Sequence, residues 1–98
     1  MLRHVFIINV KKGIPDDVVE QKMAEMRAMK EKETVIEGIT VGRTRGLLGR
    51  PDAVMMVIDL KDKAAFDVLI RSRTHTDIAE KAGEAFDMQS ADIAQIEY

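Results

Sequence analysis

The stretch Arg3-His4-Val5-Phe6-Ile7-Ile8-Asn9-Val10 decides the fold of this chain of 98 residues. Successive side chains of an extended segment point to opposite faces, and both alternating sets here are apolar along the middle. A strand that is apolar on both faces lies inside a sheet and is covered on both sides. We therefore expect residues 3–11 to form a central strand, with the titratable side chain of His4 set into it.

A helix and two strands are predicted after this first strand. Pro15, Asp16 and Asp17 mark a helix start, because proline fits the first turn and carboxylates favour the positive end of the helix dipole. An apolar stripe continues this helix to about residue 33. The stripe consists of Val19, Met23, Met26 and Met29. Strands are expected over residues 34–42 and 52–61. In the first of them, strict alternation puts Val35, Ile39 and Val41 on one face and Ile36 on the other.

The C-terminal third of the chain predicts a broken helix and a last strand. Asp62 is a candidate N-cap for a helix that breaks at Ser72-Arg73. Thr74 and Asp77 have the spacing of a capping box, so we expect a second helix to begin there and to run through Phe86. A strand over residues 90–97 ends the chain.

This order of elements is the βαββαβ pattern of a ferredoxin-like fold in the α+β class. Such a domain has a four-stranded antiparallel sheet with the first and third strands in the centre. The helices can cover only one face of the sheet, so the second apolar face needs another cover. We therefore predict a homodimer in which two sheets pack face to face and enclose a hollow lined by imidazole.

The composition sets limits on the domain count and on the partners. A chain of 98 residues forms one domain, residues 1–98, and 46% hydrophobic with 33% charged residues indicates a globular protein. A net charge of −2 argues against binding to nucleic acid or to an anionic membrane surface. No apolar run reaches the ~20 residues of a membrane span. The chain has no cysteine, which fits an expected location in the cytoplasm.

The two histidines are the candidate chemical groups. His4 lies among apolar residues, where it is either a structural histidine bonded to backbone or a catalytic one. His75 directly follows the candidate cap Thr74. The partial positive charge of a helix N-terminus opposes protonation, so its ring can stay neutral and accept a proton. The alternative for His75 is a solvated side chain in the first turn of a helix.

Other constellations in the sequence favour no further site. Ser72 lies three residues before His75, but no strained nucleophile turn surrounds it, so a hydrolytic triad is not predicted. The histidines do not have the spacing of metal ligands. The loop that carries Arg43, Arg45 and Arg50 lacks the pattern of a phosphate-binding loop. It is either a charged hairpin connection or an anion-binding lid.

Several short motifs, in their order and spacing, resemble the stress-responsive α/β barrel (Dabb) domain family, of the dimeric ferredoxin-like superfamily. These motifs are Arg3-His4-Val5-Phe6, Met26-Arg27-Ala28-Met29-Lys30, Ile39-Thr40-Val41-Gly42, Asp52-Ala53-Val54-Met55-Met56-Val57 and Thr74-His75. The resemblance covers essentially the whole chain. It implies a ferredoxin-like protomer that dimerises into an α/β barrel.

The resemblance also implies a site. A plant polyketide cyclase of that family closes an aromatic ring without metal or cofactor, and its two pocket histidines correspond to His4 and His75. Met26 and Leu69 stand where the cyclase has tyrosines, and Ala53 stands where it has a further histidine. These differences make the pocket of this chain more apolar.

Three functions remain open at this point. The first is a cofactor-free enzyme of the cyclase, isomerase or lyase type, with His75 as general base and His4 as its partner or as an oxyanion stabiliser. Its substrate would be a small apolar or aromatic molecule. The second is a non-catalytic, stress-related dimeric domain that binds an apolar ligand or a protein. The third is a relative of the antibiotic-biosynthesis monooxygenases, although their usual tryptophan is absent.

Overall fold

The computed structural model describes all residues 1–98 and contains one four-stranded sheet. Its strands are β1 (Leu2–Asn9), β2 (Ile36–Arg43), β3 (Ala53–Leu60) and β4 (Asp92–Glu97). Their order is β2-β3-β1-β4, and every neighbouring pair is antiparallel. The predicted positions of the strands are confirmed, with β1 and β3 in the centre and β2 and β4 at the edges.

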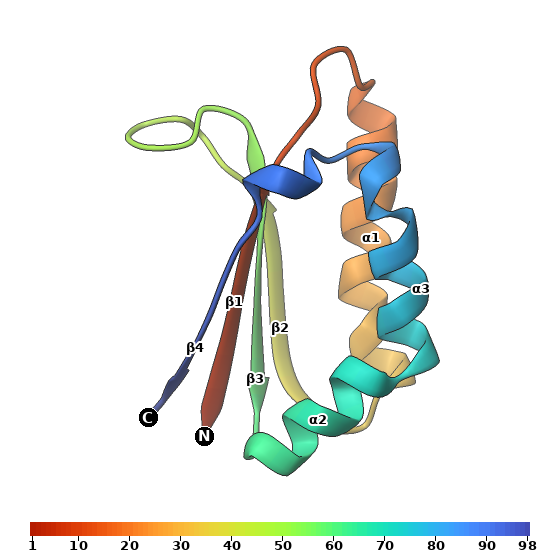
Figure 1. Cartoon of the computed structure of the whole chain (residues 1–98), viewed down its shortest axis with the longest axis vertical. Coiled ribbons are helices and arrows are strands. Elements are labelled where there is room, and N and C mark those ends of the chain that lie inside the picture. The colour runs from red at the N-terminus through yellow and green to blue at the C-terminus, as the bar shows by residue number, and fades with distance from the viewer.

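The helices all lie on one face of this sheet (Figure 1). They are α1 (Asp16–Lys32), α2 (Lys63–Arg71) and α3 (Arg73–Lys81), followed by the 3-10 turns η1 (Ala82–Glu84) and η2 (Met88–Ser90). The fold is therefore the expected ferredoxin-like βαββαβ arrangement. None of its helices has both the length and the apolar character needed to cross a membrane.

The core lies between the helices and the sheet. The predicted stripe of α1 is buried in full, because Val19, Met23, Met26 and Met29 each expose 3% of their surface or less. Opposite this stripe, Ile8 of β1 and alternate residues of β3 are buried. The buried set from β3 is Val54, Met56, Ile58 and Leu60. This packing covers one face of the sheet and leaves the other face open.

The start of α3 differs from the prediction. Its N-cap is Ser72, whose Oγ accepts a hydrogen bond from the backbone N–H of His75 at 3.1 Å. Ser72 also ends α2, so a single extended residue separates the two helices. Thr74 is therefore already helical, and its hydroxyl donates to the Glu33 carboxylate at 2.9 Å. Asp77 accepts from Arg73 Nε at 3.0 Å and does not close a capping box.

The end of α3 and the facing of residues in β2 also differ from the prediction. α3 ends at Lys81, and the chain continues as the turn η1 and does not stay α-helical to Phe86. In β2 the pairing register shifts between Ile36 and Gly38, which is a β-bulge. Because the bulge adds one residue, Ile36 lies on the core face together with Val41, although strict alternation put them on opposite faces.

The open face of the sheet has an apolar centre. Cross-strand pairing brings Val5 of β1 beside Val57 of β3 and Ala94 of β4, and Ile96 and Met55 lie on the same face. The side chains of Ile96 and Met55 are 55% and 39% exposed.

Polar groups border this centre at one end. Arg3 donates to the Asp59 carboxylate at 2.7 Å, and the Tyr98 hydroxyl donates to the same carboxylate at 3.0 Å. An apolar centre with a polar rim is the usual anatomy of a protein interface.

Candidate functional site

An apolar cavity of about 500 Å³ lies between the helices and the sheet. It is bounded by residues of β1, β3, β4 and all three helices. The lining residues are His4, Phe6, Met26, Met29, Met56, Phe66, Ile70, His75, Ile78, Ala79, Ala82, Met88, Ala91, Ile93 and Gln95. Met88 and Ile93 are more than half exposed, so the cavity opens beside η2 and β4. The hollow is thus formed within one protomer, whereas the sequence argument expected dimerisation to create it.

His4 is held in the wall of this cavity by neighbours from β4 and α2. Its side chain lies on the helix-covered face of β1 and is 5% exposed. Gln95 Nε2 lies 3.0 Å from His4 Nδ1, and the ring of Phe66 lies 5.2 Å away, centroid to centroid. Burial lowers the pKa of His4, and the charge that His75 carries when protonated lowers it further.

His75 reaches the same cavity from the first turn of α3. Its Nδ1 is the one buried side-chain nitrogen or oxygen atom in the protein that has no hydrogen-bond partner. Burial lowers the pKa of His75, and the nearby backbone carbonyl of Ile70 opposes this shift in part. Desolvation is therefore the main cause of the lowered pKa of His75, whereas the positive end of the helix was the cause expected from the sequence.

The structure brings the two predicted histidines together around one cavity. Both have a pKa below the ordinary value of 6.5, so both rings are mainly neutral at pH 7. No aspartate, glutamate, lysine or arginine lines the cavity. The site therefore combines an apolar volume with two neutral imidazoles, which can donate and accept hydrogen bonds and transfer protons.

The remaining residues that the resemblance implied are placed differently. Met26 lines the cavity, whereas Leu69 and Ala53 are fully buried outside its wall. Sequence reasoning missed Gln95, which β-pairing sets directly opposite His4. The signal that could have identified it is a polar side chain two residues after Ile93, on the same face of the last strand.

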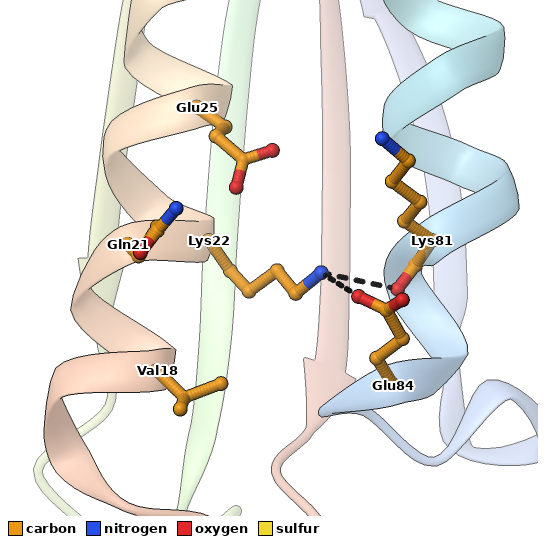
Figure 2. A pocket seen from close by; sticks show the side chains of 6 residues that line it. All are labelled: Val18, Gln21, Lys22, Glu25, Lys81 and Glu84. Atoms are coloured by element: carbon orange, nitrogen blue, oxygen red, sulfur yellow. Dashed lines mark hydrogen bonds and ion pairs between the residues drawn. The ribbon is translucent and has the colours of Figure 1, made fainter.

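A second hollow, of about 490 Å³, lies between α1 and α3 (Figure 2). Lys22 Nζ reaches across it to the Glu84 carboxylate at 2.5 Å and to the backbone carbonyl of Lys81 at 3.3 Å. It is an open cleft with mostly polar walls and no histidine, so we place the candidate site in the apolar cavity.

The arginine loop is fixed to the body of the domain. Arg43 forms ion pairs with Asp52 at 2.8 Å and with Asp16 at 2.9 Å, and it lowers the pKa of Asp52. Arg50 binds the backbone carbonyl of Ser90 at 2.7 Å and also pairs with Asp92. These contacts favour a structural connection over an anion-binding lid.

No group of three or more His, Cys, Asp or Glu side chains is placed to hold a metal ion.

The comparisons with known proteins identify the fold. No family model matches the chain, and no curated protein matches it in sequence. A dimeric ferredoxin-like protein of unknown function from Thermobifida fusca is similar in structure, with a TM-score of 0.84 and 17% identity over 99% of this chain and 90% of that chain. The hydroxynitrile lyase of Passiflora edulis matches with a TM-score of 0.84 and 12% identity over 97% and 90%. An antibiotic biosynthesis monooxygenase matches with a TM-score of 0.81 and 14% identity over 100% and 98%. At these identities the similarity establishes a ferredoxin-like fold, and activity must be argued from the site.

Proposed function

We propose that the cavity binds a small, uncharged apolar or aromatic molecule, and that His75 and His4 act on it by acid-base chemistry without a cofactor. The observation that carries this proposal is that both imidazoles line one apolar cavity of about 500 Å³. Ligand-binding pockets typically have volumes of roughly 300–1,000 Å³ and a few polar groups in an apolar wall.

The absence of charged side chains from the wall selects neutral ligands. A carboxylate or an amine would lose its hydration on entering and would find no counter-charge. An aromatic or aliphatic body with one oxygen beside the histidines would keep its hydrogen bonds and lose only unfavourable contacts with water.

The two rings suit different parts of one proton transfer. No side chain forms a hydrogen bond with the His75 ring, and its lowered pKa leaves the ring neutral, so we assign it the role of general base. His4 is anchored by Gln95 and can stabilise an oxygen on which negative charge develops. The reaction class would be that of a cyclase, isomerase or lyase, and the shared fold of the hydroxynitrile lyase fits the last of these. The alternative, a non-catalytic ligand-binding domain, would use the same cavity for binding alone.

We also propose that the chain is a divergent Dabb-type domain and forms a homodimer through the open face of the sheet. The apolar centre around Val5, with Ile96 and Met55 exposed on the same face, needs a cover, and the Thermobifida fusca protein of the same fold is dimeric. Leu47 and Leu48, which are 77% and 96% exposed, lie in a loop that projects on this same side (Figure 1). They extend the surface available to a second copy.

Binding of a neutral fluorescent probe, N-phenyl-1-naphthylamine, tests the ligand proposal. Ile93→Asp puts a carboxylate at the opening of the cavity, and because a bound probe would take water from that charge, probe binding should weaken about tenfold. Val68→Asp is the matched control, since Val68 is similarly exposed but lies outside the cavity. Equal affinities in the two variants would show that the probe binds elsewhere.

A further inference from the structure

The side chain of Gln95 touches His4 at the nitrogen that faces β4. Gln95 and His4 are direct partners in the β1–β4 pairing, and Gln95 Nε2 lies 3.0 Å from His4 Nδ1. An amide nitrogen donates hydrogen bonds and does not accept them, so in the orientation that turns the Gln95 amide nitrogen to the ring, Nδ1 presents its lone pair. In a neutral ring the single proton is then on Nε2.

We propose that Gln95 is a positioning residue that holds His4 in the Nε2-protonated tautomer, so that His4 donates a hydrogen bond into the cavity. His4 Nε2 has no partner within the protein, and it is not among the nitrogen atoms sealed from solvent. Because His4 as a whole is buried in the cavity wall, the accessible surface of Nε2 faces the cavity. A ligand oxygen is the group that this N–H would meet.

The arrangement makes the two histidines complementary. No side chain fixes the tautomer of His75, and the one polar group near its ring is the backbone carbonyl of Ile70. The His4 ring is thus a fixed hydrogen-bond donor, and the His75 ring can adopt the tautomer that accepts a hydrogen bond from a ligand. A hydroxyl group has the chemistry that both rings need, since its oxygen accepts a hydrogen bond and its hydrogen is donated. The hydrogen bond from His4 to a ligand rests on the proposed function, whereas the tautomer of His4 in the ligand-free protein does not.

The surroundings of His4 leave Gln95 as the group that selects the tautomer. Phe66 of α2 packs against the ring and offers no hydrogen bond. His75 of α3 is the one titratable group that acts on His4. The contact with Gln95 is the only hydrogen bond that either ring nitrogen makes.

NMR of the imidazole nitrogens in the ligand-free protein tests the proposal, at a pH that keeps both rings neutral. In the wild type, His4 Nδ1 should resonate as an unprotonated nitrogen and Nε2 as a protonated one. Gln95→Glu replaces the donor by an acceptor, so the two resonances should exchange their order. Gln95→Leu removes the contact and should move both resonances to intermediate positions. Gln89→Glu, the same change in the exposed turn η2, should leave His4 as in the wild type.

Two results would overturn the proposal. One is a wild-type His4 whose Nδ1 carries the proton, and the other is an unchanged pattern in both Gln95→Glu and Gln95→Leu. Loss of the donor in Gln95→Leu keeps the test valid even where Gln95→Glu does not fold. Since the measurement needs no ligand, its failure leaves the probe-binding proposal standing, and failure of probe binding leaves the tautomer standing.

Discussion

Burial of two imidazoles has a consequence for stability that can be measured. The pKa values of His4 and His75 are lowered in the folded protein, so the unfolded chain binds protons more readily than the folded chain as the pH falls through 6.5. The free energy of unfolding should therefore be constant above about pH 7 and should fall as the pH falls from there to about pH 5.

Chemical denaturation of the wild type and of a His4→Gln/His75→Gln variant measures this effect. The variant should show a flatter dependence of stability on pH over the same range, because it lacks both groups. If the free energy of unfolding fell with equal slope in the two proteins, other titratable groups would be the cause of the fall. That result would contradict the burial of the neutral rings.

Part of the site was predictable at the residue scale. His4 could be identified because a titratable side chain stands out in an apolar strand, and His75 because it lies in the first turn of an expected helix. Gln95 could not be identified, because its role depends on the register of β4 against β1, and pairing register is set by contacts between residues distant in the sequence. The hydrogen bond between Gln95 and His4 links residues 91 positions apart.

At the scale of elements, the break between α2 and α3 positions His75. Ser72 ends the first helix, and its Oγ caps the second by accepting from the backbone N–H of His75. Thr74 was the cap expected from the sequence, and Ser72 is the cap in the structure. With Thr74 as the cap, His75 would be the first residue of the helix, and with Ser72 as the cap it is the third. Two positions along a helix correspond to a rotation of about 200° around its axis, so the choice of cap changes where His75 lies relative to the start of the helix.

Removal of the cap should cost measurable stability. Ser72→Ala should lower the free energy of unfolding by about 1 kcal/mol, because the first turn of α3 loses a hydrogen-bond acceptor. Thr76→Ala is the control, since the Thr76 hydroxyl only donates to the carbonyl of Arg73 on the exposed surface, and it should change stability by less than ~0.5 kcal/mol. Equal losses in chemical denaturation would contradict Ser72 as the cap.

At the scale of the whole molecule, the uneven distribution of helices was readable from the sequence. Two strands that are apolar on both faces, with helices for one face only, imply an uncovered surface. The position of the cavity was not readable, because a hollow arises where side chains of several elements fail to fill the space between them. From the sequence, a hollow enclosed by two protomers was expected, whereas the packing of α1, α2 and α3 over the sheet forms a hollow within one protomer.

Sedimentation analysis tests the proposed dimer. The wild type should sediment as a dimer at micromolar concentrations, and Ile96→Asp should shift it to a monomer by placing a charge among the apolar side chains of the open face. Val68→Asp, which changes the helical side, should remain dimeric. A wild-type monomer at high concentration would refute this interface.

The most direct test of the central claim is base catalysis in the cavity on a neutral aromatic probe. In nitrobenzisoxazole, a base removes the proton on carbon, the ring N–O bond breaks, and a nitrile with a phenolate oxygen forms. We expect the wild type to accelerate this reaction beyond imidazole at equal concentration, with a pH dependence that reports a pKa below 6.5. His75→Ala should reduce the rate by about 100-fold, while Gln21→Ala in the polar cleft should leave it unchanged. A wild-type rate no greater than that of free imidazole, or an unchanged rate in His75→Ala, would contradict the account.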